Sequence, residues 1–95
     1  MITHGRASTA LADRYIRQLV KHWGHKFATS YADGLGKVPF SAETQATFDA
    51  SDGGIAITLV TADVESAERM KEVIASHLNR FAFREGELAF EWCEA

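Results

Sequence analysis

Apolar residues recur at two spacings along this chain, and each spacing predicts a different kind of secondary structure. A spacing of three and four residues over 9–24, and again over 63–81, predicts two amphipathic helices. Strict alternation of apolar and polar residues predicts strands elsewhere. The predicted strands cover residues 3–9, 26–32, a short piece at 38–40, 44–50, 55–60 and 88–93. The buried stripe of the second helix is predicted to comprise Ala67, Met70, Val73, Ile74, His77, Leu78 and Phe81.

Capping and turn residues place the ends of these segments. Thr9 is predicted to cap the first helix with its side chain, and Gly24 is predicted to end that helix in a left-handed conformation. Asp63 is predicted to cap the second helix in the same way as Thr9. The Asp-Gly pairs at 33–34 and 52–53 are typical of tight hairpin turns, so the strands that flank them should pair in antiparallel fashion.

The resulting order, β-α-β-β-β-β-α-β, predicts an α+β two-layer sandwich. Sequential hairpins give a largely antiparallel sheet, and both helices can cover one face of it. The 95 residues are enough for one domain, which we place at 1–95. Because Pro39 has no backbone N–H, the strand Val38-Pro39-Phe40 is predicted to lie at an edge of the sheet. The face without helices is predicted to present Thr47, Asp49, Ala56, Thr58 and Val60.

Charge and cysteine content narrow the classes of partner. The formal net charge of −3 provides no basic excess, so no nucleic-acid partner is predicted. No apolar run approaches the roughly 20 residues that span a bilayer, so no membrane partner is predicted either. The single cysteine, Cys93, excludes a disulfide within the chain and fits a reducing compartment. These features favour a cytoplasmic protein, monomeric or homodimeric, whose partner is a small molecule or another protein.

The segment Lys21-His22-Trp23-Gly24-His25-Lys26 places two of the four histidines beside a tryptophan at the end of the first helix. A helix that continued through His22 and His25 would bring both to one metal ion. A zinc site needs three or four ligands, and His77 is a candidate third if the two helices lie side by side. Gly24 favours a helix that ends before His25, and a role at the helix dipole for His22. We therefore predict no metal and no cofactor, and keep metal or haem binding by His22, His25 and His77 as the alternative.

The remaining candidates lie in the second helix and just after it. His77 stands in an otherwise apolar stripe, which favours a core histidine with a hydrogen-bonded ring; a general base in a small enzyme is the alternative. Arg80 and Arg84 have the side chain that binds carboxylates and phosphates, although the sequence favours pairing of Arg84 with Glu85. No complete catalytic constellation is indicated, so no catalytic residue is predicted. The candidate ligand-binding residues are His22, Trp23, His25, His77, Arg80 and Arg84.

Two parts of the chain carry a resemblance to a known family. Two pairs of segments resemble the signatures of the bacterial family called domain of unknown function 2218: residues 14–19 with 21–26, and residues 77–85 with 88–92. The resemblance extends over essentially the whole chain and implies a small stand-alone bacterial domain. Fusions of its relatives to siderophore-interacting flavin proteins imply a link to iron uptake. It also implies a fold similar to the TATA-binding-protein-like sandwich, as in the C-terminal domain of phosphohexomutases. Residues 34–37 lack the pattern of a phosphate-binding loop, so no mutase activity is implied.

These observations lead to one main hypothesis and three alternatives. The main hypothesis is a non-catalytic binding or accessory module, linked to iron or siderophore handling. Its contact surface would be either the region around His22, Trp23, His25, His77 and Arg84, or the open sheet face. The alternatives are metal or haem binding by the three histidines, an enzyme with His77 as base, and self-association through the edge at 38–40.

Overall fold

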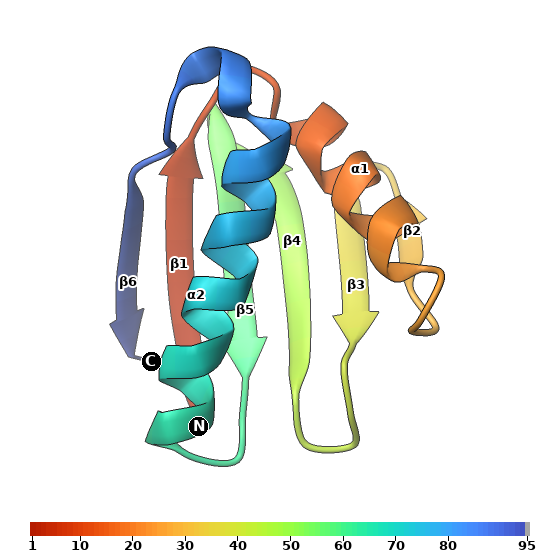
Figure 1. Cartoon of the computed structure of the whole chain (residues 1–95), viewed down its shortest axis with the longest axis vertical. Helices are drawn as coiled ribbons and strands as arrows, with labels where there is room; N and C mark the ends of the chain where they lie inside the picture. The colour runs from red at the N-terminus through yellow and green to blue at the C-terminus, as the bar shows by residue number, and fades with distance from the viewer. Residues whose placement is uncertain (95) are drawn as a thin grey trace.

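The computed structural model describes residues 1–94 and shows a six-stranded sheet with two helices on one of its faces (Figure 1). The elements are β1 (Ile2–Ser8), α1 (Ala12–Trp23), β2 (Ser30–Ala32), β3 (Leu35–Pro39), β4 (Gln45–Ser51), β5 (Gly54–Val60), α2 (Val64–Phe81), the 3-10 helix η1 (Phe83–Glu85) and β6 (Phe90–Glu94). In Figure 1, α1 crosses β3 and β4, whereas α2 runs along β1 and β5. The predicted α+β two-layer sandwich and its order of helices and strands are confirmed.

The sheet is antiparallel throughout, with the strand order β2-β3-β4-β5-β1-β6. Strands β2 to β5 follow one another as hairpins, and β1 lies between β5 and β6. Both predicted Asp-Gly turns are present, with φ of 48° and 82° at Asp33 and Gly34 and of 47° and 74° at Asp52 and Gly53. Positive φ at both central residues matches the right-handed twist of the strands that follow. Local turn chemistry therefore sets the registers of these two hairpins.

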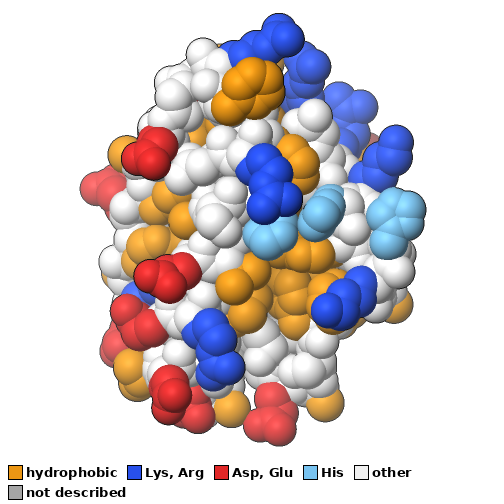
Figure 2. All heavy atoms as spheres, viewed as in Figure 1, with side chains coloured by type: hydrophobic (Ala, Val, Ile, Leu, Met, Phe, Trp, Pro, Cys, Tyr) orange, Lys and Arg blue, Asp and Glu red, His pale blue; other side chains and the backbone are white. Residues whose placement is uncertain are grey.

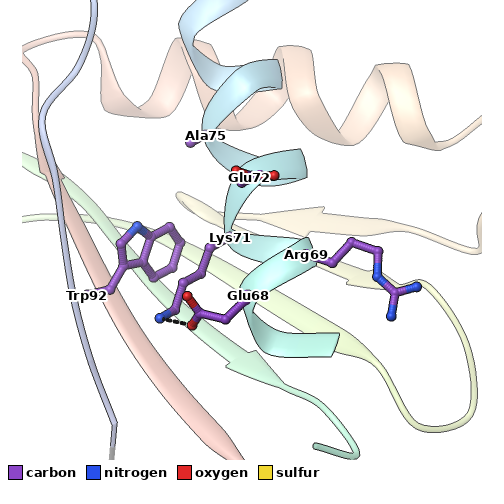
Figure 3. A pocket seen from close by; sticks show the side chains of 6 residues that line it. All are labelled: Glu68, Arg69, Lys71, Glu72, Ala75 and Trp92. Carbon is purple, nitrogen blue, oxygen red and sulfur yellow. Dashed lines mark hydrogen bonds and ion pairs between the residues drawn. The ribbon is translucent and has the colours of Figure 1, made fainter. Parts of the chain in front are cut away.

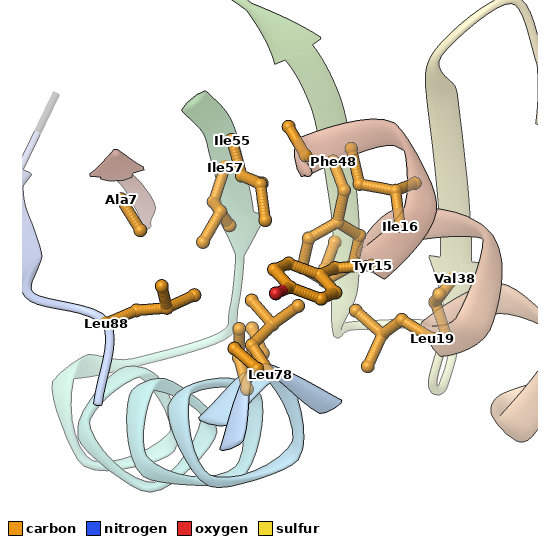
Figure 4. Packing of buried hydrophobic residues seen from close by; sticks show 14 of the residues in the cluster. Ala7, Tyr15, Ile16, Leu19, Val38, Phe48, Ile55, Ile57, Leu78 and Leu88 are labelled. Carbon is orange, nitrogen blue, oxygen red and sulfur yellow. The ribbon is translucent and has the colours of Figure 1, made fainter. Parts of the chain in front are cut away.

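The core lies between the sheet and the helices. Alternate strand residues point toward the helices and meet the apolar stripes of α1 and α2, as Figure 4 shows. The fully buried side chains include Phe48, Ile55, Ile57 and Leu59 from the sheet, and Ile16, Leu19, Ile74 and Leu78 from the helices. Because α1 and α2 share this core, they are held side by side, and a seam of side chains runs between them.

The opposite face of the sheet has no helix over it within residues 1–94. Cross-strand partners place Thr47 beside Thr58, and Asp49 beside Ala56, on this face. All of the predicted residues, Thr47, Asp49, Ala56, Thr58 and Val60, are half-buried or exposed there. The predicted open face is therefore confirmed.

The start of α1 differs from the prediction. The helix begins at Ala12, and the residue before it, Leu11, makes no side-chain cap. Thr9 instead accepts a hydrogen bond from the Leu11 N–H at 3.1 Å and donates its hydroxyl hydrogen to Glu85 at 2.8 Å. The predicted cap by Thr9 was wrong because the helix begins three residues later, so the Thr9 hydroxyl oxygen accepts the N–H of Leu11, which precedes the helix, and not an N–H of the first turn. The cap by Asp63 is confirmed, since its carboxylate accepts the Ser66 N–H at 2.8 Å.

The end of α1 is placed correctly, but the reason given for it was wrong. Gly24 follows the last helical residue and has a φ of −62°, which is not left-handed. The chain leaves the helix because the N–H groups of Lys26 and Phe27 turn back to the Trp23 carbonyl, at 3.0 Å and 2.8 Å. This turn occupies part of the predicted strand 26–32, of which only Ser30–Ala32 is a strand. Neither helix of residues 1–94 is long and apolar enough to cross a membrane.

Two further strands differ from the prediction. β3 lies between β2 and β4, so it is not an edge strand as a whole, and the edges of the sheet are β2 and β6; only the predicted segment 38–40 is unpaired on its β2 side. Pro39 is tolerated because β2 ends where Ser30 pairs with Lys37, and leaves Pro39 without a neighbour on that side. The last strand begins at Phe90 instead of residue 88. Leu88 remains outside it because its N–H donates to the Asn79 side chain at 2.7 Å.

Candidate functional site

A groove of about 430 Å³ opens on the helical side of the molecule, where the end of α1 meets α2. α1 contributes His22 and Trp23 to it, and α2 contributes His77. The other lining residues are Lys26, Phe27, Phe40, Met70 and Val73. We call this site the histidine groove. Figure 2 shows histidine side chains gathered beside an apolar patch on this face, with cationic side chains around them.

Aromatic rings form most of the histidine groove. The rings of Trp23 and His77 have centroids 4.8 Å apart, and those of His22 and His77 lie 5.2 Å apart. Phe40 meets Trp23 edge to face at 4.8 Å. Because Trp23 is only 6% exposed, it forms the floor of the groove and not its rim. Flat apolar surfaces of this kind suit a flat ligand ring.

A backbone hydrogen bond fixes the ring of His77. Its Nδ1 lies 2.7 Å from the Val73 carbonyl oxygen, and the ring is half-buried. A carbonyl oxygen can only accept, so Nδ1 carries a proton, and in a neutral imidazole this leaves the acceptor lone pair on Nε2. The hydrogen-bonded ring predicted for His77 is confirmed. The ring therefore offers one acceptor atom beside an aromatic surface.

The structure brings together only some of the predicted site residues. His22, Trp23 and His77 meet in the histidine groove, whereas His25 is exposed on the turn after α1 and does not line the groove. Arg80 is exposed near the end of α2, and Arg84 lies in η1 beside a different cavity. Within residues 1–94, no three His, Cys, Asp or Glu side chains are grouped as metal ligands. The three histidines therefore do not form a common metal site in this arrangement.

Glu85 holds the end of α2 against the start of α1. Its carboxylate accepts hydrogen bonds from the hydroxyls of Thr9 and Tyr15. The predicted pairing of Arg84 with Glu85 was wrong, since Arg84 instead lies over the Phe83 ring, 5.6 Å from its centroid. The hydrogen bond to Glu85, followed by burial, raises the pKa of Tyr15 above the usual value of 10.0.

Both tyrosines of the chain should therefore ionise only at unusually high pH. Tyr31 donates its hydroxyl hydrogen to Asp13, and this hydrogen bond, followed by burial, raises the Tyr31 pKa above 10.0. A raised pKa stabilises the folded state below pH 10, and this contribution is lost as pH rises through the folded-state pKa. Titration by tyrosinate absorbance should show both midpoints above 10, and Tyr15→Phe should remove one of them. In denaturant the midpoints should return to about 10. A midpoint at or below 10 in the folded protein would contradict the two hydrogen bonds.

A second hollow, of about 470 Å³, lies on the other side of α2, between that helix and β6. Figure 3 shows Trp92 on β6, Lys71 on the side of α2 that faces it, and Arg69 pointing away from both. The Lys71 ammonium lies 2.6 Å from the Glu68 carboxylate, so the two charges largely neutralise each other. Trp92 stacks on Phe90 with centroids 5.9 Å apart, so its ring packs along the surface of β6. This hollow therefore offers less specific chemistry than the histidine groove.

Sequence reasoning did not identify two aromatic residues that line the histidine groove, Phe27 and Phe40. Phe40 follows β3, and Phe27 lies in the turn after α1, with their centroids 5.1 Å apart. Both residues are aromatic in otherwise irregular segments, which was the only signal available. No spacing rule connects either of them to His77, because the contact depends on how α1 lies across the sheet.

Comparisons with a family model and with a solved structure both match nearly the whole chain. A family model described as "Uncharacterized protein conserved in bacteria (DUF2218)" matches residues 4–93. The structure is similar to the NMR structure of PA4090 from Pseudomonas aeruginosa, with a TM-score of 0.81 and 30% sequence identity. That similarity covers 97% of this chain and 94% of the other. No curated protein matches the chain. Every residue of the histidine groove lies within the matched region.

Proposed function

The chain belongs to the DUF2218 family of uncharacterised bacterial proteins, as its resemblance to that family implied, and for this member we propose a non-catalytic binding role. The protein would bind a small aromatic molecule with acidic hydroxyl groups, of the catechol type, in the histidine groove. It would act in the cytoplasm, alongside iron or siderophore handling. The observation that carries the proposal is the meeting of His22, Trp23 and His77 from two helices around one groove.

The groove supplies complementary chemistry for each part of such a ligand. The rings of Trp23 and Phe40 line the groove and offer apolar surface to an aromatic ring. His77 offers an acceptor at Nε2, because the Val73 carbonyl holds its proton on Nδ1. Lys26 lines the same groove, and its positive charge favours the ionised form of an acidic hydroxyl. A volume of about 430 Å³ falls within the range of small-molecule sites.

The link to iron rests on the family resemblance and on the ligand class. Relatives fused to siderophore-interacting proteins, which the resemblance implies, would provide the context. Catechol is an iron-chelating group, so the same ring that fits the groove also belongs to that context. Binding is preferred over catalysis because catalysis requires a nucleophile, a base and an orienting group held together, whereas the polar groups of the groove are suited to recognition.

Tryptophan fluorescence can test this proposal. The chain has two tryptophans, so Trp92→Phe leaves Trp23 as the only reporter. Addition of catechol should change the Trp23 emission in a saturable way, after correction with N-acetyltryptophanamide for absorption by the ligand. In this background, His77→Gln should weaken binding by about threefold to tenfold, the effect of one lost hydrogen bond, and His22→Gln should weaken binding because it removes one ring from the groove.

His25→Gln is the matched control, because His25 is near His22 in sequence and does not line the groove. It should leave the affinity unchanged. The proposal fails if catechol produces no saturable change, or if His25→Gln weakens binding as much as His77→Gln does.

A further inference from the structure

A smaller cavity, distinct from the histidine groove and from the hollow beside β6, lies at the other end of the seam between the helices. It has a volume of about 190 Å³ and lies between the first half of α1 and the segment 81–85. The lining residues that matter here are Arg14, Tyr15, Gln18, Phe81, Phe83 and Arg84. Phe81 separates it from the histidine groove, since its ring lies 6.2 Å from that of His22. The two sites are therefore neighbours, with different lining side chains.

The charge at this cavity is positive although the whole chain has a net charge of −3. Figure 2 shows Lys and Arg side chains gathered at one end of the helical face, and Asp and Glu toward the other end. Within residues 1–94 the ion pairs are Arg17–Asp13 and Lys71–Glu68, so Arg14 and Arg84 have no carboxylate partner there. Two guanidinium groups that form no ion pair with the described residues thus lie beside one small cavity.

The one carboxylate beside the cavity, that of Glu85, already accepts hydrogen bonds from other side chains. Glu85 accepts hydrogen bonds from Thr9, at 2.8 Å and 3.1 Å, and from the Tyr15 hydroxyl. Its single negative charge offsets only one of the two arginines. Arg84 is also restricted, because its guanidinium lies over the exposed Phe83 ring. An arginine held in this way loses less freedom when it binds an anion.

We propose that this cavity is a second binding site, specific for a small aromatic carboxylate. The rings of Tyr15, Phe81 and Phe83 offer apolar surface, and the guanidinium groups of Arg14 and Arg84 would both donate hydrogen bonds to the carboxylate. The volume of about 190 Å³ suits a single ring, since cavities of similar size hold benzene. This site does not depend on the ligand proposed for the histidine groove.

Benzoate is the probe for this site, and amide chemical shifts in two-dimensional NMR are the readout. Benzoate should cause saturable shifts at Tyr15, Gln18 and Arg84. Benzamide has the ring without the charge, and acetate has the charge without the ring. Each should bind at least about tenfold more weakly, because each lacks one of the two contributions.

Substitutions identify the groups responsible. Arg14→Gln and Arg84→Gln should each weaken benzoate binding by about tenfold or more. Arg17→Gln is the matched control, because Arg17 lies on the same helix but pairs with Asp13 at 3.0 Å. All three side chains are exposed, so the variants should fold, which well-dispersed amide spectra would establish.

Several results would overturn the proposal. Shifts confined to Trp23 and His77, equal responses to benzoate and benzamide, or equal losses in Arg17→Gln and Arg84→Gln would each do so. Absence of saturation at any soluble concentration of benzoate would do so as well. Loss of catechol binding in the histidine groove would leave the proposal untouched, since the two tests use different probes and reporters.

Discussion

Phe48→Ala is expected to lower the free energy of unfolding by about 3–5 kcal/mol, the largest effect of any substitution considered. Phe48 is fully buried on β4, one of the two central strands of the sheet. Its ring lies 6.3 Å from that of Trp23, so it supports the floor of the histidine groove from the sheet side. The loss comes from the buried apolar area and from the cavity that the missing ring leaves behind. Urea denaturation followed by circular dichroism measures it.

The adjacent residue provides the control for this prediction. Thr47 lies on the same strand but points to the open face. Thr47→Ala should therefore cost less than about 1 kcal/mol. A protein of this size has only about 5–14 kcal/mol of stability in total, so Phe48→Leu serves as a milder variant if Phe48→Ala does not fold. Equal losses for Thr47→Ala and Phe48→Ala would contradict the assignment of the two faces.

Gly36→Ala is expected to destabilise the protein by about 1–3 kcal/mol, because α1 packs directly on this glycine. A Cβ at residue 36 would lie 2.7 Å from the Val20 Cγ2 and 2.8 Å from the Ile16 Cγ2. Both neighbours are β-branched and stiff, so neither can rotate aside easily. Replacement of glycine by alanine usually stabilises by about 0.4–1 kcal/mol through the unfolded chain. The free-energy cost of the steric overlap exceeds this gain, so the net change in stability is unfavourable.

A double-mutant cycle separates the steric contact from other causes. Val20→Ala removes the closest methyl group, so Gly36→Ala should cost less in that background, with a coupling energy of about 0.5 kcal/mol or more. Thr47→Ala, on the open face, should instead be additive with Val20→Ala to within about 0.5 kcal/mol. Strict additivity of Gly36→Ala and Val20→Ala would show that α1 does not press on this glycine.

The contact between Gly36 and α1 also affects the histidine groove. Gly36 lets α1 approach β3 closely, and α1 carries His22 and Trp23 toward α2. A shift of α1 would therefore change the distance between the His22 and His77 rings, now 5.2 Å. The groove is a product of helix placement, and not of either helix alone.

Local chemistry in the sequence was enough to predict most of the fold. Alternation over 44–50 and 55–60 predicted two strands, because successive side chains of a strand point to opposite faces. The Asp-Gly turns were predictable because few other residues adopt positive φ at both positions. Asp63 was predictable as a cap because its partner, the Ser66 N–H, is three residues away. Each of these features depends on residues that are close in sequence.

Features that depend on distant residues were missed or only partly predicted. Thr9 looked like a cap, but the helix begins only at Ala12, and the Thr9 hydroxyl donates its hydrogen to Glu85, 76 residues away. The strand containing Pro39 looked like an edge strand because proline has no N–H to donate. The sequence does not show that β2 ends before it reaches Pro39, which is what allows β3 to lie inside the sheet. His25 was grouped with His22 because the sequence does not say where α2 meets α1, and His25 lies outside the groove that these helices form.

The sequence by itself determined the α+β class, the two helices, the hairpin turns and the face of each strand that is buried. Those properties follow from periodicity and from backbone preferences that act over a few residues. Only the tertiary structure decided that His77 would meet His22 and Trp23, that Phe40 would complete their groove, and that Arg14 and Arg84 would flank one cavity. Such contacts are set by how the two helices pack on the sheet, which depends on the fit of many buried side chains at once.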